Sequence, residues 1–431
     1  MHVGLPNLTL KILAIGDATN NFYLMQKYAK NFEVHLIDFP KKGVDIKAHS
    51  SPSGEVELFD SLLISKQVDK IKQIKDEFDL CIAKPWAGAR IAYLAGLNYI
   101  MYFTGSDIIT PPFVKNAKHP YSDEVTENFS SLERWFYRKV FDSAIACVST
   151  TDEYFLPLQK YRKDAIRIDR ICVDTELFNE NVSKYNLQKK KFTFFSPQRL
   201  GLEKGYELIW DAINLCKSDF DFLQVKWFVE SNRGGTAVTD PTKLSKINRD
   251  LYENAPRQVK FIPLIDHKDL GKYFCGCDAI IGEMRGGFQP GIDREAAFCK
   301  KPVLSYSDPN KKIIVDGKNI ESPFLPKSRN ARELADLIDK IVESKEFRDD
   351  LAAKEYEYIK NLSTPELVMK DWKSVFEKLG KKYKTIDRKT SFYEKIVNYF
   401  GLSFERFYIK KFREKNIQVR GEKEYELLTK R

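Results

Sequence analysis

Short apolar runs alternate with longer segments of helical periodicity along most of the chain. Five runs of strand length occupy the first part: LKILAIG, FEVHLIDF, FDLCIAK, LNYIMYF and SAIACVS. A second series begins at Lys191 and comprises FTFF, QVKWFVE, VKFIPL, DAIIG and KPVLSY. Continuous apolar strands that alternate with helices indicate parallel sheets covered on both faces. The pattern predicts an α/β protein with two Rossmann-like domains that face each other across a cleft.

The polar stretch FNENVSKYNLQKK, which has no periodicity, separates the two series and marks the boundary between the domains. Ligands of open α/β sheets bind at the carboxyl ends of the strands. The loops at those ends carry Gly105, Arg199, Gly234, Gly235 and Gly286. We therefore expect the functional site to be built from these loops.

The composition is that of a globular protein. The 431 residues are 43% apolar and 13% aromatic, which is enough to bury the cores of two domains. No apolar run is long enough to span a bilayer, and the first run is better interpreted as a strand than as a signal peptide. The seven cysteines are scattered, odd in number and mostly set in apolar runs, so we expect reduced thiols in a cytoplasmic protein.

The formal net charge of +10 favours anionic partners, namely nucleoside diphosphates, acidic lipid headgroups or nucleic acid. We expect no nucleic-acid partner, because no helix-turn-helix, RNP-like or zinc-finger pattern occurs. Cys275 and Cys277 have no partner pair and no neighbouring His-x-His, so we expect no metal site.

The segment SPQRLGLEKG carries two cations in a loop between a strand-like run and the helical run YELIWDAINL. Arg199 and Lys204 are five residues apart in this loop. A helix N-terminus presents free N–H groups and a partial positive charge, so it favours anions. The arrangement predicts that Arg199 and Lys204 neutralise a diphosphate. The alternative is a pair of solvated surface charges.

A second segment, residues 278–306, is typical of a βαβ unit with a glycine-rich loop. The loop contains Gly286, Gly287 and Gly291, which allow the backbone to approach a ligand closely. Glu295 follows in the early part of a helix, where a carboxylate binds sugar hydroxyls or simply complements the helix macrodipole. We expect the neighbouring Arg294 to be a surface charge, and a further phosphate contact is the alternative.

Together these segments resemble the retaining GT-B glycosyltransferases of the group 1 type, glycosyltransferase family 4. The G-R-L-x-x-x-K-G loop of that family is matched by Gln198-Arg199-Leu200 and Lys204-Gly205. Its D…E-A-x-A-x-G-x-P-V stretch is matched without a gap by Asp278, Glu295, Ala296, Ala297, Pro302 and Val303. The linker motif N-G-V-D-x-x-x-F appears as CVDTELF, and a-D-x-v-i-a-v-S appears as FDSAIACVS. The resemblance covers roughly residues 8–380, and the motifs occur in the family's order.

The resemblance implies transfer of a sugar from a nucleoside-diphosphate sugar to a glycan or lipid-linked acceptor, with retention of configuration and without a metal or other cofactor. It implies a catalytic role for Arg199 and Lys204 at the departing diphosphate, and ribose binding by Glu295. The donor would also contact the loop of Gly286, Gly287, Phe288 and Gln289. The residues on the acceptor side would be Thr104, Gly105 and Asp107. Asp107 in FTGSDI fits a turn or a helix cap equally well.

The chain departs from the family pattern at three places. The first Glu of the paired-glutamate motif falls on Gly287, and Glu283 lies nearby but out of register. Thr104 stands where the family has a His, and the usual Gly-Gly loop after the first strand is DATNN. A divergent enzyme and a catalytically silent GT-B binding or scaffolding subunit are both consistent with these changes, and we favour the enzyme because the diphosphate and ribose residues are kept. A sugar-nucleotide epimerase is a third alternative, for which no general base can be placed.

The resulting plan has an N-terminal acceptor domain at residues 1–183 and a C-terminal nucleotide-sugar domain at residues 184–362. Residues 363–384 resemble the family's closing helix, which returns to the N-terminal domain, and residues 385–431 form a basic aromatic tail. In the tail, helical spacing of aromatic residues precedes a basic cluster: Phe400, Phe404, Phe407, Tyr408, Lys410, Lys411 and Arg413. Such a helix suits an anionic surface on the inner face of a membrane, and packing on the body or on a partner subunit is the favoured alternative.

Overall fold

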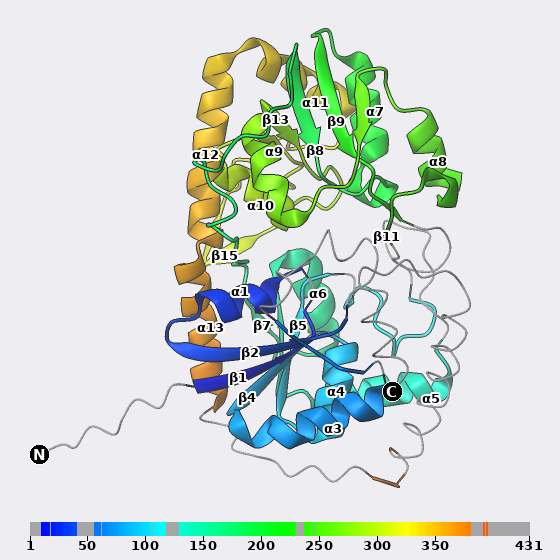
Figure 1. The fold of residues 1–431 in the computed structure, drawn as a ribbon, viewed down its shortest axis with the longest axis vertical. Coiled ribbons are helices and arrows are strands. Elements are labelled where there is room, and N and C mark those ends of the chain that lie inside the picture. Colours follow the sequence, from blue (N-terminus) through cyan, green and yellow to red (C-terminus); the bar gives the residue numbers. More distant parts are fainter. Residues whose placement is uncertain are drawn as a thin grey trace, which may run out of the picture.

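The computed structural model describes residues 10–17, 19–40, 56–61, 63–105, 107–117, 129–229, 237–244, 246–380, 391, 392 and 394. These residues form two lobes, each built around a parallel sheet with helices on both faces (Figure 1). The architecture confirms the predicted pair of Rossmann-like domains. Gly234, Gly235 and nearly all of the tail at residues 385–431 lie outside the described residues. Among the described helices, none is both long and apolar enough to cross a membrane.

Within the described residues, the N-terminal sheet has seven parallel strands in the order β3-β2-β1-β4-β5-β6-β7. Those strands are β1 (Leu10–Ile15), β2 (Phe32–Asp38), β3 (Glu57–Leu58), β4 (Leu80–Ala83), β5 (Tyr99–Phe103), β6 (Ala146–Ser149) and β7 (Ile166–Arg167). The helices beside them are α1 (Asn21–Tyr28), α3 (Ile64–Ile74), α4 (Ala87–Ala95), α5 (Ser131–Ser143) and α6 (Thr151–Tyr161). Because side chains alternate along a strand, Leu13 and Ile15 enter one core while Ile12 and Ala14 enter the other.

The C-terminal sheet is parallel and, in the described part of the chain, has five strands in the order β12-β9-β8-β13-β14. Those strands are β8 (Phe192–Ser196), β9 (Phe220–Val225), β12 (Val259–Ile262), β13 (Ala279–Ile281) and β14 (Val303–Leu304). Its helices are α7 (Tyr206–Leu215), α8 (Lys246–Glu253), α9 (Leu270–Gly276), α10 (Gly291–Phe298) and α11 (Ala331–Glu343). Antiparallel ribbons are formed by β10 (Phe228–Val229) with β11 (Ala237–Val238), and by β15 (Ile313–Val315) with β16 (Lys318–Ile320).

The second strand of the C-terminal sheet begins earlier than the expected run QVKWFVE. β9 starts at Phe220 and pairs with β8 as far as Gln224, and the buried Phe220 and Phe222 face the core beside α7. After Val225 the chain turns, and the Trp227 N–H donates to the Val225 carbonyl at 2.9 Å. The apolar run is therefore divided between the end of β9 and the ribbon strand β10, so the expectation of one strand over this run was wrong.

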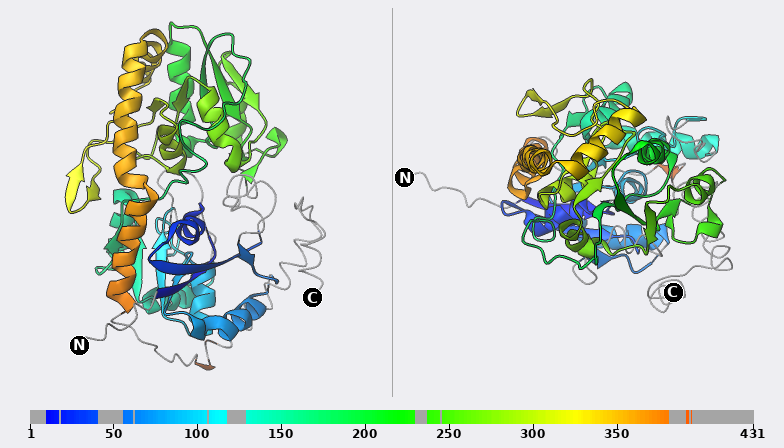
Figure 2. Two further views of the ribbon diagram at one scale, coloured as in Figure 1. Left: turned by 60° about the vertical axis from the view of Figure 1, so that its left-hand side comes forward. Right: turned by 90° about the horizontal axis from the view of Figure 1, so that it is seen from above.

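Two consecutive helices connect the lobes along one side of the molecule (Figure 2). α12 (Lys345–Ser363) packs on the C-terminal core, and α13 (Pro365–Gly380) packs on the N-terminal core. In α13, the side chain of Trp372 is 1% exposed. The centre of its ring lies 4.8 Å from that of Tyr102 on β5 and 5.4 Å from that of Phe376. α13 is therefore part of the N-terminal core, although it follows the C-terminal domain in the sequence.

The β15–β16 ribbon of the C-terminal domain is held against the N-terminal domain by hydrogen bonds. Asp152 in the first turn of α6 accepts from the Lys312 N–H at 2.8 Å, and Asp169 after β7 accepts from the Ile314 N–H. Arg167 pairs with these two carboxylates at 2.6 and 2.7 Å. The ribbon therefore sets how the two sheets face each other.

We expect Trp372→Ala to lower the free energy of unfolding by about 3–5 kcal/mol, because the substitution leaves a cavity in the N-terminal core. Lys373→Ala is the matched control, since the Lys373 side chain is 40% exposed on the same helix. Chemical denaturation of both variants measures the difference. Equal stability of the two variants would contradict the packing of α13 into this core.

Candidate functional site

A pair of adjoining cavities lies between the two domains in the described structure. The large cavity has a volume of about 410 Å³, and the small cavity has a volume of about 270 Å³. Lys204, His267 and Glu295 line both of them. Arg199, in the large cavity, follows β8, and Thr150, in the small cavity, follows β6. The cavities are thus located at the carboxyl ends of both sheets, where the ligands of such folds bind.

The loop between β8 and α7 places Arg199 and Lys204 in the large cavity. The short 3-10 turn η2 (Leu202–Lys204) leads into Gly205, which adopts a left-handed conformation with φ of 78°. A Cβ atom at Gly205 would come within 3.0 Å of the Met284 carbonyl carbon, so the position requires glycine. The Met284 N–H donates to the Lys204 carbonyl at 3.0 Å. The loop is therefore packed tightly on the segment that follows β13.

Both cations of this loop are paired with carboxylates of the chain. Arg199 Nε lies 3.2 Å from Glu203 Oε1, and Lys204 Nζ lies 2.7 Å from Glu283 Oε2. The other oxygen of Glu283 accepts from the Gly286 N–H at 2.9 Å. Burial alone would lower the pKa of Lys204, but the Glu283 carboxylate raises this pKa above its ordinary value, so the ammonium group stays charged. An anionic ligand that bound here would replace Glu203 and Glu283 as partners of the two cations.

Glu295 on α10 presents one carboxylate oxygen to a partner and leaves the other without one. Its Oε1 lies 2.9 Å from Nε2 of His267 in the turn η4 (His267–Asp269). Its Oε2 is buried and has no hydrogen-bond partner among the described residues. Burial alone would lower the pKa of His267, but the Glu295 carboxylate outweighs this effect and raises the pKa overall. Oε2 therefore retains an unused capacity to accept hydrogen bonds.

The segment after β13 brings two of the four predicted loop residues to the small cavity, whereas Gly286 and Gly287 are not among the described residues that line either cavity. Phe288 and Gln289 are buried and line it, and Gln289 Nε2 has no partner within the described residues. Gly287 has a φ of 78°, and a Cβ atom there would lie 2.7 Å from the Asp308 Cβ. This position excludes a glutamate without rearrangement of the loop. Glu283, which lies out of register in the sequence motif, lines both cavities instead.

Two of the three residues predicted on the acceptor side are brought to the site. Thr104 lines the small cavity, and Gly105 lines the large one. Asp107 is not among the described residues that line either cavity. Its carbonyl accepts from the Trp86 indole N–H at 3.1 Å, and burial raises the pKa of its carboxyl group. Asp107 therefore lies in the turn after β5, which is the alternative that the sequence also allowed.

Glu153 is a cavity residue that the sequence did not indicate. It lies in the first turn of α6 and lines the large cavity, and burial raises its pKa to about 7. Lys311 Nζ lies 3.5 Å from Glu153 Oε2 and also donates to the Gly286 carbonyl. A carboxyl group of the N-terminal domain thus approaches the glycine-rich loop of the other domain. His267 was missed for the same reason as Glu153, because the partners of both are remote in the sequence.

Arg294 is not the surface charge that was expected from the sequence, because its side chain is buried with 1% exposure. Its Nε donates to the Gln289 carbonyl at 3.0 Å, and its Nη1 donates to Ser363 Oγ at 3.2 Å. Burial lowers the pKa of its guanidinium group. Arg294 therefore ties the loop before α10 to the junction of α12 and α13.

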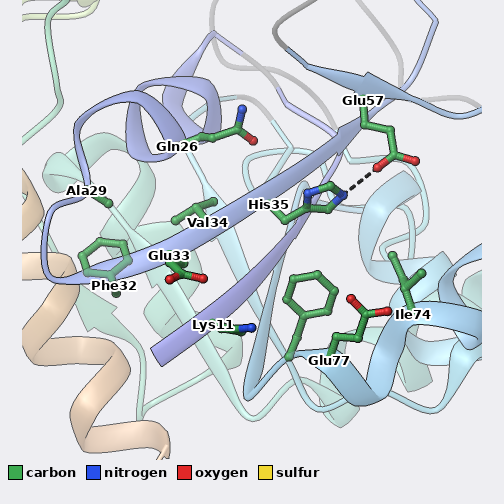
Figure 3. Close-up of a pocket in the computed structure, with 11 residues that line it drawn as sticks. Lys11, Gln26, Ala29, Phe32, Glu33, Val34, His35, Glu57, Ile74 and Glu77 are labelled. Carbon is green, nitrogen blue, oxygen red and sulfur yellow. Dashed lines mark hydrogen bonds and ion pairs between the residues drawn. The ribbon is translucent and has the colours of Figure 1, made fainter. Parts of the chain in front are cut away.

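A further cavity, of about 550 Å³, is present on the N-terminal domain (Figure 3). Lys11 and Glu33, near the amino ends of β1 and β2, contribute to its lining. His35 and Glu57, which also line it, form a pair at 2.6 Å. The cavity therefore opens beside the amino-terminal half of the sheet, away from the strand ends that bind ligands in such folds. None of the predicted site residues is among its described lining residues, so the interdomain cavities remain the candidate site.

Comparison with known protein families identifies the domain that holds most of this site. The family model described as glycosyl transferases group 1 matches residues 178–358. This stretch includes Arg199, Lys204 and Glu295. A comparison with curated proteins finds no match.

Solved structures share the complete fold at low sequence identity. Anabaena HepE in complex with UDP and glucose is 16% identical with a TM-score of 0.60, and the match covers 86% of this chain and 100% of that one. The sucrose-phosphate synthase of Thermosynechococcus elongatus is 15% identical with a TM-score of 0.59, over 87% of this chain and 100% of that one. An α-glucosyltransferase in complex with UDP and DNA is 10% identical with a TM-score of 0.60, over 86% of this chain and 100% of that one.

The family match covers the domain with the diphosphate and ribose candidates, and the structural matches cover both lobes. The resemblance inferred from the sequence motifs is therefore confirmed. Residues 178–358 therefore form a glycosyl transferases group 1 domain, and the two lobes together have the GT-B fold of the matched structures.

Proposed function

We propose that this protein transfers a sugar from a nucleoside-diphosphate sugar to a hydroxyl group of a glycan or lipid-linked acceptor, with retention of configuration and without a metal ion. The observation that carries the proposal is the presence of Arg199, Lys204 and Glu295 in one interdomain cavity. Two cations complement a diphosphate, and a carboxylate oxygen without a partner complements the hydroxyl groups of a ribose.

The large cavity also contains a suitable environment for a nucleotide base. Part of its lining is apolar and includes Val225, Trp227, Leu264 and Ile265. An apolar surface with a few polar groups is typical of sites for small organic ligands. The base would occupy this surface, while Glu295 Oε2 would accept from the ribose and the two cations would contact the diphosphate.

The reaction depends on stabilisation of the leaving group. When the bond between the anomeric carbon and the diphosphate oxygen breaks, negative charge grows on the diphosphate, and Arg199 and Lys204 would neutralise it. The acceptor oxygen would form the new bond on the same face of the sugar, which retains the configuration. The proton of the acceptor hydroxyl would pass to the departing diphosphate oxygen.

The structural relatives indicate which donor to test first. HepE has been solved with UDP and with UDP-glucose, and the α-glucosyltransferase has been solved with UDP. We therefore propose a uridine nucleotide as the first candidate for this chain. Guanosine and adenosine nucleotides are the alternatives, because the apolar lining of the large cavity suits any base.

A catalytically silent binding subunit is the second candidate function. The observation that favours it is the pairing of both cations with carboxylates of the chain, at 3.2 Å for Arg199 and 2.7 Å for Lys204. If these pairs were permanent, the diphosphate could not bind. Nucleotide binding and sugar release together distinguish this alternative from the enzyme.

The proposal is tested by thermal shift and isothermal titration with UDP, GDP, ADP and their common sugar conjugates, without added metal. We expect one base series to raise the melting temperature, because a ligand that binds the native state stabilises it by mass action. The matching nucleotide sugar should then release its nucleoside diphosphate when acceptors are added. Absence of any shift, or binding without release, would favour the silent subunit.

Variants of the two cations locate the binding site in the same assay. Arg199→Ala and Lys204→Gln should each weaken nucleoside-diphosphate binding by about ten- to a hundredfold, because each removes a charge-assisted hydrogen bond. Lys191→Ala is the matched control, since Lys191 precedes β8 and pairs at the surface with Asp219. Unchanged affinity in the first two variants would place the diphosphate elsewhere.

The pair of His267 and Glu295 predicts how stability depends on pH. The folded-state pKa of His267 lies above the ordinary value of about 6.5, so protonation of His267 favours the folded protein. This contribution is fully present below about pH 6.5 and is lost as the pH rises through the folded-state pKa. We therefore expect the melting temperature to fall more steeply between about pH 6 and pH 9 in the wild type than in His267→Gln.

The comparison of these two proteins isolates His267 from other groups that titrate in the same range. Glu153, with its pKa raised to about 7, contributes equally to the pH dependence of the melting temperature in both proteins. The glutamine side chain keeps a hydrogen-bond donor but does not titrate. If the melting temperatures of the two proteins fall equally with pH, His267 is not the group whose titration lowers the stability.

A further inference from the structure

The small cavity contains a group of buried polar atoms without partners on its N-terminal wall. These atoms are Asn20 Oδ1, Thr150 Oγ1 and Thr151 Oγ1, and none has a hydrogen-bond partner within the described residues. The three residues are 6%, 1% and 1% exposed. Native proteins pair nearly all buried polar atoms, because an unpaired one is costly. Three such atoms on one wall indicate a ligand that provides the missing partners.

The C-terminal domain contributes two further atoms of the same kind to the small cavity. Gln289 Nε2 and Glu295 Oε2 are buried and also have no partner in the part of the chain that the structure describes. Residues of both domains that line the small cavity therefore carry buried hydrogen-bond donors and acceptors without partners. A ligand that satisfies them must itself both donate and accept hydrogen bonds.

The N-terminal wall carries no positive charge that would attract an anionic ligand. Among the described lining residues of both cavities, every Lys and Arg belongs to the C-terminal domain, namely Arg199, Lys204 and Lys268. The N-terminal domain instead contributes the carboxyl groups of Glu153 and Asp174. Asp174 is paired with Lys27 at 3.0 Å and Glu153 with Lys311 at 3.5 Å, so neither carboxyl group offers attraction to a phosphate or carboxylate ligand.

The helix N-termini of this wall are also occupied by carboxylates of the chain. Asp17 accepts from the N–H groups of Phe22 and Tyr23 in the first turn of α1, at 3.2 and 2.9 Å. Asp169 accepts from the Thr151 N–H at the start of α6, at 2.7 Å. An anionic group would have to displace these carboxylates to reach the backbone donors. The wall therefore suits an uncharged ligand.

We propose that Asn20, Thr150 and Thr151 form a subsite for the hydroxyl groups of an uncharged sugar ring. Sugar hydroxyls donate and accept, so they can satisfy the amide oxygen and both threonine hydroxyls at once. The subsite rests on the proposed sugar transfer and selects a neutral sugar over a phosphorylated or carboxylated one. The ring belongs either to the transferred sugar of the donor or to the acceptor, and binding measurements separate these two sources.

Thr150→Val tests the subsite with little effect on the fold. Valine has nearly the shape of threonine, and the hydroxyl group that is removed has no partner within the described residues. The melting temperature should therefore be unchanged or higher. Thr193→Val is the matched control, because Thr193 is buried near the amino end of β8 and its hydroxyl donates to the Lys191 carbonyl at 3.0 Å.

Isothermal titration of the full-length protein compares three sets of probes. The first set is UDP, and the second set is UDP-glucose and UDP-galactose. If the nucleotide screen selects another base, the corresponding nucleotides of that base are used instead. The third set is methyl glucoside and methyl galactoside, with glucose 6-phosphate and glucuronic acid as charged counterparts, each with and without saturating nucleoside diphosphate.

We expect Thr150→Val to leave the affinity for nucleoside diphosphates unchanged. The variant should weaken binding of either the nucleotide sugars or the methyl glycosides by about three- to tenfold. Thr193→Val should change none of these affinities. In the wild type, the charged sugars should bind more weakly than the methyl glycosides. A loss confined to the nucleotide sugars assigns the subsite to the transferred sugar, and a loss confined to the methyl glycosides assigns it to the acceptor.

Three results would overturn the subsite. They are unchanged affinity of Thr150→Val for both classes of neutral sugar, tighter binding of the charged sugars, and failure of the wild type to bind any neutral sugar probe. Failure of the proposed donor function has a different signature. In that case no nucleotide binds, whereas the methyl glycosides still bind and still respond to Thr150→Val.

Discussion

The contact between the β15–β16 ribbon and the N-terminal domain is the constraint on which the site depends. Asp152 and Asp169 accept hydrogen bonds from the ribbon backbone. Arg170 extends the contact, because its guanidinium group pairs with Asp316 in the turn of the ribbon at 2.8 Å and with Asp371 of α13 at 3.0 Å. The Arg170 side chain is buried and that of Asp371 is partly buried, whereas Asp316 is exposed, so the buried guanidinium group has a partner on each element. The carboxyl ends of both sheets are thereby held around one pair of cavities.

The two walls of the cavities differ in charge, and this difference suggests that each wall binds a different chemical group. The C-terminal wall carries the cations, which Glu203 and Glu283 neutralise within the chain. The N-terminal wall carries neutral polar atoms and carboxyl groups, including Glu153. A diphosphate is therefore favoured on one side and an uncharged, hydroxyl-rich group on the other. Transfer of a sugar between them would take place where the two cavities adjoin.

Much of the fold could be predicted from the sequence because hydrophobic periodicity is a local property. The run YELIWDAINL coincides with α7 (Tyr206–Leu215), although β9 was misplaced because its limits depend on pairing with β8 and β12. The loops of the site could be located, since they follow strand ends. The pairings within the site could not be predicted, because Lys204 and Glu283 are 79 residues apart, and Glu153 and Lys311 are 158 residues apart. Only the folded chain brings such groups into contact.

A crystal structure of the protein with a bound nucleoside diphosphate would test the central claim most directly. We expect the diphosphate within hydrogen-bond distance of Arg199 and Lys204, with the ribose hydroxyls at Glu295. The carboxylates of Glu203 and Glu283 should then have moved away from the two cations. A nucleotide bound outside the interdomain cavities, or bound within them with its diphosphate directed away from both cations, would contradict the account.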